Sequence, residues 1–109
     1  MTRATPRLGH EPIAMRRVED YAAIERAGDF YWDRDPDGSP TFVVAHPSPR
    51  RDEFGDGYTV INLPIRHGKN EPGKHWGWDG NEDTPTLAPS IHTHGHWHGF
   101  VRAGQLEEA

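Results

Sequence analysis

The chain has 109 residues, no cysteine and a formal net charge of −5 at pH 7. Its length fits a single domain with one core, and the lack of cysteine excludes disulfide bonds and thiolate metal sites. No apolar stretch has the length of a secretory signal or of a membrane span, which needs roughly 18 to 20 residues. We therefore expect a cytoplasmic protein without membrane contact.

Residues that usually fill a core are scarce. Leu, Ile, Val and Phe together account for 18 residues, whereas Gly and Pro account for 22. Four Trp, four Phe and three Tyr compensate, because each buries a large apolar area. We predict a mainly β fold: a small antiparallel sheet, sandwich- or barrel-like, with a short N-terminal helix and long Gly/Pro-rich loops.

Charge is distributed unevenly along the chain. Residues 1–17 contain four arginines and one acid, and their proline and glycine content predicts a flexible basic N-terminal arm. Residues 18–58 contain ten acids and four arginines, which disfavours binding of nucleic acid by the folded body. Residues 18–109 are expected to form a single β-rich domain.

The first elements are predicted from capping and turn residues. A short helix is expected over about residues 18–27, with Asp20 as its N-cap and Gly28 at its end. Beyond it we expect a hairpin, with a strand over residues 29–33, a turn over 35–38 and a second strand over 41–46.

The later elements are predicted from alternation. Residues 58–66 form a third strand, which we expect to be central because both its faces are partly apolar, although Pro64 indicates an end or an edge there. A Gly- and Pro-rich segment follows over residues 67–90. We then expect two extended segments, over 91–98 and 100–102, and a turn over 103–105 that leads into a last short strand.

Histidine alternates with other residues near the C-terminus, at His92, His94, His96 and His98. In an extended strand these side chains line one side, about 6.5 to 7 Å apart, and two of them can bind one zinc ion. A further ligand would come from elsewhere, from His46, His67, His75 or an acid such as Asp79 or Glu82. We take His46, His94, His96 and His98 as the candidate metal ligands. The alternative is a row of exposed histidines that holds no ligand.

Two tryptophans, Trp76 and Trp78, flank Gly77. In extended backbone both indoles face the same side. One interpretation is a core pair that compensates for the shortage of aliphatic residues. The other is an interaction surface that stacks against a base, a sugar or a proline of a partner.

Three motifs carry a family resemblance: Trp-Gly-Trp-Asp-Gly-Asn, Pro-Thr-Leu-Ala-Pro-Ser-Ile and Trp-His-Gly-Phe-Val-Arg-Ala-Gly, over residues 76–81, 85–91 and 97–104. They resemble the core of a small phage and prophage protein family of unknown function. The resemblance covers roughly residues 18–104 and implies a location in the cytoplasm of a bacterial host. It brings no activity with it.

The resemblance also implies a zinc site, because many members of that family carry a cysteine-rich segment and a later Cys just ahead of the position of His98. This chain has His46-Pro47-Ser48-Pro49 in place of the former and Gly95 about where the latter would be. The resemblance therefore implies either that histidines have taken over as ligands or that packing has replaced the metal. Only His98 carries over directly.

Three functions follow as hypotheses. The first is a phage-type β domain with a structural zinc site near His98. The second is an acidic interaction protein that binds and inhibits a host enzyme or defence complex without catalysis. The third, a metal-dependent hydrolase, ranks last. No catalytic residue is predicted, because none of the serines (Ser39, Ser48, Ser90) lies in a nucleophile motif.

Overall fold

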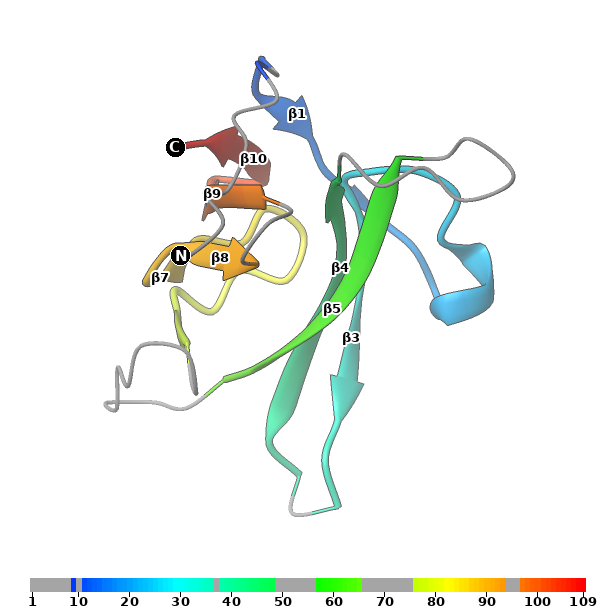
Figure 1. Ribbon diagram of the computed structural model, residues 1–109. Coiled ribbons are helices and arrows are strands. Elements are labelled where there is room, and N and C mark those ends of the chain that lie inside the picture. Colours follow the sequence, from blue (N-terminus) through cyan, green and yellow to red (C-terminus); the bar gives the residue numbers. More distant parts are fainter. Residues whose placement is uncertain (1–8, 10, 37, 49–56, 66–75, 94–96) are drawn as a thin grey trace, which may run out of the picture.

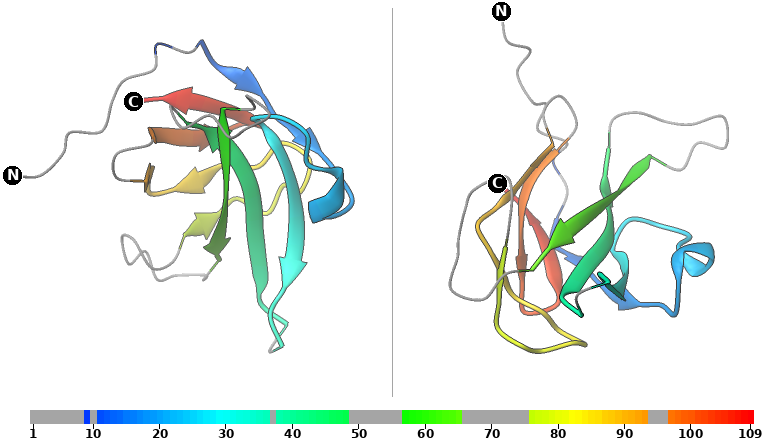
Figure 2. Two further views of the ribbon diagram at one scale, coloured as in Figure 1. Left: turned by 45° about the vertical axis from the view of Figure 1, so that its right-hand side comes forward. Right: turned by 90° about the horizontal axis from the view of Figure 1, so that it is seen from below.

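The structure, a computed structural model, describes residues 9, 11–36, 38–48, 57–65, 76–93 and 97–109. Two four-stranded sheets pack against each other (Figure 1), and Figure 2 shows them from two further directions. The N-terminal sheet has the order β2 (Arg16–Arg17), β3 (Asp29–Arg34), β4 (Pro40–Pro47), β5 (Tyr58–Pro64). The C-terminal sheet has the order β1 (Ile13–Ala14), β10 (Gln105–Glu108), β9 (Trp97–Arg102), β8 (Ile91–Thr93).

A third, two-stranded sheet pairs β6 (Gly77–Trp78) with β7 (Leu87–Ala88). All strand pairs within the three sheets are antiparallel except β2 with β3. The predicted mainly β architecture, with two sheets that face each other as in a sandwich, is confirmed.

The core lies between the two larger sheets. The N-terminal sheet contributes Phe30, Phe42, Val44 and Leu63, and the C-terminal sheet contributes Ile91, Trp97, Val101 and Leu106; all are at most 3% exposed. Successive residues of a strand point to opposite faces, and β9 follows this rule with alternating buried and less buried positions. The inward face of each sheet is therefore fixed by its apolar residues.

The central strand of the N-terminal sheet is β4. All its residues from Thr41 to Pro47 are buried, so that both of its faces are covered. The expectation that the strand beginning at Tyr58 is central was wrong, because β5 pairs only with β4 and ends the order of this sheet. Its end at Pro64 was predicted, since proline cannot donate a hydrogen bond to a further strand.

The two predicted hairpin turns differ in type. Gly38 donates to the carbonyl of Asp35 at 2.8 Å and has a φ of +86°, as the Asp-Pro-Asp-Gly sequence predicts. Between β9 and β10, Ala103 and Gly104 both have positive φ, at 47° and 76°. Two successive residues with positive φ match the twist of a tight two-residue hairpin.

The predicted helix over 18–27 is only one turn of 3₁₀ helix, η1 (Tyr21–Ala23). Asp20 caps it as predicted, by accepting a hydrogen bond from the Ala23 N–H. The backbone becomes extended at Ile24, and the next two residues form hydrogen bonds with Asp29. The Glu25 N–H donates to the Asp29 carboxylate, and the Arg26 carbonyl accepts from the Asp29 N–H. These local hydrogen bonds to Asp29 compete with continuation of the helix.

The segment over 13–17 connects the two sheets. β1 pairs with β10 in the C-terminal sheet, and two residues later β2 pairs with β3 in the N-terminal sheet. The structure thus differs from the predicted arm at its C-terminal end, because these residues are strands. Residues 1–8 and 10 lie outside the described part of the chain.

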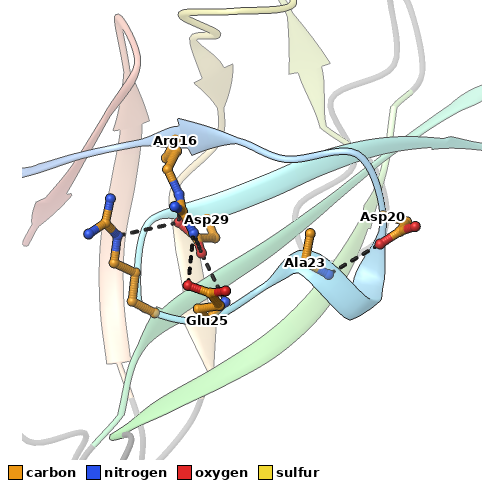
Figure 3. Close-up of polar contacts among 6 residues, drawn as sticks. Arg16, Asp20, Ala23, Glu25 and Asp29 are labelled. Atoms are coloured by element: carbon orange, nitrogen blue, oxygen red, sulfur yellow. Dashed lines mark hydrogen bonds and ion pairs between the residues drawn. The ribbon is translucent and has the colours of Figure 1, made fainter.

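A buried carboxylate anchors this segment. Asp29 is fully buried and accepts two hydrogen bonds from Arg16, from Nε at 3.0 Å and from Nη2 at 2.7 Å (Figure 3). Burial by itself raises the pKa of Asp29, but the hydrogen bonds from Arg16 and from the backbone outweigh it, so that the net pKa is lowered. The ionised carboxylate is therefore the form that the fold stabilises.

The neighbouring arginines provide a matched test of this anchor. Both side chains are 42% exposed, but the partner of Arg16 is buried, whereas the Asp83 partner of Arg17 is 81% exposed. We expect Arg16→Met to lower the free energy of unfolding by about 2 to 3 kcal/mol, because the buried Asp29 carboxylate loses two short hydrogen bonds and keeps only Arg26, at 3.7 Å, as an ion-pair partner. Arg17→Met should cost less than about 1 kcal/mol. Urea unfolding of both variants checks this, and equal losses would contradict it.

The lowered pKa of Asp29 gives stability a pH dependence. Its stabilising contribution is present above the ordinary value of 3.8 and is lost as pH falls through the lower value of the folded state. The difference in unfolding free energy between the wild type and Asp29→Asn should therefore be largest above about pH 5 and shrink below about pH 4. Urea unfolding at several pH values measures it; a constant difference would contradict the assignment.

Candidate active site on the outer face of the C-terminal sheet

The histidine-rich segment is a hairpin and not a single strand. β8 and β9 run antiparallel with Ile91 opposite Gly99, His92 opposite His98 and Thr93 opposite Trp97. The expectation that four histidines line one side of one continuous strand was therefore wrong. The described histidines of this segment, His92 and His98, lie instead on neighbouring strands, directly opposite each other.

This register brings a serine and a histidine together. Ser90 directly precedes β8, and its Oγ lies 3.0 Å from Nε2 of His98. Extended by one residue, this register puts Ser90 level with Phe100, so that His98 is a diagonal neighbour of Ser90 on the same face and within side-chain reach. In the tautomer with a proton on Nδ1, the Ser90 hydroxyl donates this hydrogen bond to Nε2. Both side chains are partly exposed.

Two aromatic rings contact the imidazole of His98. The His92 ring stacks on it with centroids 4.6 Å apart and an interplanar angle of 29°. The Phe100 ring lies 6.1 Å away at 37°. In the described part of the chain, the side chain of His98 makes contacts with Ser90, His92 and Phe100, and no carboxylate is among them.

The outer face continues along β9 toward β10. The guanidinium of Arg102 lies 4.1 Å above the centroid of the Phe100 ring. Its Nη1 is 3.9 Å from the Glu107 carboxylate on the neighbouring strand. A row of side chains therefore leads away from Ser90: imidazole, phenyl ring and guanidinium, at the spacing of alternate residues in a strand.

The inner face beneath this row is closely packed. Trp97 is 1% exposed, and its indole lies against the backbone of Gly99. An added Cβ on Gly99 would overlap the indole and lie 2.6 Å from the Glu107 carbonyl oxygen. Only glycine therefore fits between Trp97 and β10 at the position next to His98.

His46, on β4, lies against the inner face of the C-terminal sheet, whereas His98 is on the outer face of that sheet. It is fully buried and stacks on Trp97 with centroids 5.4 Å apart. Its Nδ1 lies 2.7 Å from the Pro47 carbonyl oxygen, so Nδ1 carries the proton, and Nε2 accepts from the Thr93 hydroxyl at 3.1 Å. Both ring nitrogens are thus engaged within the protein.

The candidate zinc ligands do not assemble in the described part of the chain. No group of three His, Cys, Asp or Glu side chains there could hold a metal ion, and His94 and His96 lie outside the described residues. The engaged nitrogens of His46 also leave it no lone pair for a metal in this arrangement. The described residues therefore do not fit the zinc site that the phage-family resemblance implied.

The two tryptophans of the other candidate surface have different environments. Trp76 is 7% exposed and belongs to the core. Trp78 packs against the core and lies against Trp32 in a tilted arrangement, with centroids 4.4 Å apart and an interplanar angle of 37°. The indole N–H groups of Trp78 and Trp32 donate to the carbonyls of Asn81 and Glu82. Trp76 and Trp78 therefore both contribute to packing.

A serine hydroxyl that is hydrogen-bonded to an imidazole is the arrangement with which serine hydrolases activate their nucleophile. The model of one protein family, BubE, described as "Bacterial ubiquitination-like system serine protease", matches residues 55–109, just over half of the chain. This chain belongs to the BubE family. The matched region includes both Ser90 and His98.

No curated protein and no solved structure matched the chain. Across the residues that the structure describes, none of the helices is long and apolar enough to cross a membrane.

Ser90 is the residue that the sequence analysis missed. It has no flanking nucleophile motif, and its proximity to His98 depends on the hairpin between β8 and β9. The signal that could have found it is the alternation of side chains: in a hairpin that pairs residues 91–93 with 97–99, residues 90, 92 and 98 share one face. The assumption of one continuous strand placed Ser90 and His98 far apart.

The close packing at Gly99 leads to a prediction. Gly99→Ala forces the Trp97 indole or the β10 backbone to move, and we expect a loss of about 2 to 3 kcal/mol in the free energy of unfolding. Thermal and urea unfolding measure this loss. Stability equal to that of the wild type would show that the indole is not held against Gly99.

Proposed function

We propose that this chain is a serine protease in which Ser90 is the nucleophile and His98 the general base. The observation that carries the proposal is the 3.0 Å contact between Ser90 Oγ and His98 Nε2. Membership of the BubE family supports the same chemistry and points to a protein of a bacterial ubiquitination-like system as substrate. The bond that is cleaved is then a peptide or isopeptide amide.

Acylation follows from the geometry. As Ser90 Oγ attacks the carbonyl carbon of the substrate, its proton passes to Nε2 of His98, and a tetrahedral intermediate with a negatively charged oxygen forms. The imidazolium then gives this proton to the amide nitrogen, the C–N bond breaks and the amine leaves. The acyl group remains on Ser90 as an ester.

Deacylation uses the same two residues. Water enters the place of the departed amine, His98 accepts one of its protons, and the resulting hydroxide attacks the ester carbonyl. When the second tetrahedral intermediate collapses, His98 returns the proton to Ser90 Oγ and the carboxylic acid is released. The single imidazole thus acts as base and acid in turn.

The location on an outer sheet face suits a protein substrate. Ser90 and His98 are partly exposed; Ser90 directly precedes β8, the last strand in the sheet order, and His98 lies on the neighbouring β9. An extended segment of another protein can approach such a face without unfolding of the enzyme. Neither the zinc hypothesis nor the host-partner hypothesis accounts for the Ser90–His98 contact.

The proposal is tested by labelling with a fluorophosphonate probe, which reacts with activated serines. We expect stoichiometric labelling of the wild type at Ser90, located by mass spectrometry of the tryptic peptide. Ser90→Ala should abolish labelling, and His98→Gln should slow it at least about 10³-fold, because removal of either member of such a pair disables the nucleophile.

Ser39→Ala provides the matched control, since Ser39 lies in the turn between β3 and β4 of the other sheet and should be dispensable. Unfolding curves of all variants establish that they remain folded. An unlabelled wild type, or equal labelling of wild type and Ser90→Ala, overturns the proposed function.

A further inference from the structure

Among the described residues, His98 has no carboxylate to orient it. In serine proteases with three-residue sites, a carboxylate accepts a hydrogen bond from Nδ1–H and holds Nε2 toward the serine. Among the residues that the structure describes, no carboxylate contacts His98. A rotation about the Cβ–Cγ bond would turn Nε2 away from Ser90, and this torsion is broad in histidine.

His92 has the geometry to restrain this rotation. It lies directly opposite His98 in the antiparallel register, where side chains on one face are about 4.5 to 5.5 Å apart at Cβ. Its ring stacks on the His98 ring at 4.6 Å and 29°. A change in the ring plane of His98 would cost this stacking contact.

The neighbours on the same face complete the restraint. Phe100, two residues along β9, lies 6.1 Å from the His98 ring, and Arg102 lies over the Phe100 ring. The imidazole therefore contacts a ring on the neighbouring strand and another on its own strand, with Ser90 at its Nε2.

We infer that His92 is a positioning residue, whose stacked ring takes the orienting role that a carboxylate has elsewhere. This inference rests on the proposed function of Ser90 and His98. His92 does not touch the reacting atoms, so its ring face matters and its ability to carry a proton does not. An aromatic residue without ionisable nitrogens can then replace it.

The test compares three variants by the rate of fluorophosphonate labelling at Ser90, resolved into the maximal inactivation rate and the probe concentration at half-maximal rate. We expect His92→Ala and His92→Leu to lower the maximal rate by about 3- to 10-fold without changing the half-maximal concentration. His92→Phe should stay within about twofold of the wild type. Gln105→Ala, an exposed residue of β10, is the control.

Leucine retains bulk but not a ring face, so the contrast between His92→Phe and His92→Leu separates stacking from space filling. Unfolding curves establish that each variant remains folded. Wild-type rates in His92→Leu, or equal losses in His92→Phe and His92→Leu, overturn the positioning role while labelling of Ser90 persists. If the wild type itself is not labelled at Ser90, the proposed function and this inference both fail.

Discussion

The antiparallel register between β8 and β9 determines where the chemistry of this protein can lie. Ile91, Trp97 and Val101 face the core, and this inward set fixes which residues face outward. A slip of one residue in β9 would exchange the two faces, burying His98 and exposing Trp97. The apolar core thus holds Ser90 Oγ and His98 Nε2 within hydrogen-bond distance, although neither contributes to it.

Beneath the site, the core is filled by the close fit of a tryptophan against its neighbours and less by aliphatic side chains. Trp97 fills the space between the sheets, stacks on buried His46 and lies against Gly99. His46 in turn satisfies both ring nitrogens with the Pro47 carbonyl and the Thr93 hydroxyl, so a polar ring can be buried without an unpaired group. A chain with few aliphatic residues thereby obtains a rigid base for the outer face.

Local signals predicted much of the N-terminal sheet. The Asp-Pro-Asp-Gly turn and its flanking strands follow from nearby residues, and Asp20 caps η1 as expected. The pairing of the 13–17 segment depends on residues far apart in sequence. The Ser90–His98 contact joins residues eight positions apart and depends on a chain reversal between them, and alternation reveals neither. The histidine alternation has the same period in one strand as in a hairpin, so it could not locate the reversal between Thr93 and Trp97. That ambiguity led to the zinc hypothesis and concealed Ser90.

The family match covers residues 55–109, and these residues include β8, β9 and β10 but not β1 to β4. The inward side of the C-terminal sheet packs against Phe30, Phe42 and Val44, which precede the matched region. A fragment that begins near residue 55 would therefore expose Ile91, Trp97 and Leu106 to water and would not be an autonomous folding unit. The half of the chain that carries the serine and histidine needs the other half as its scaffold.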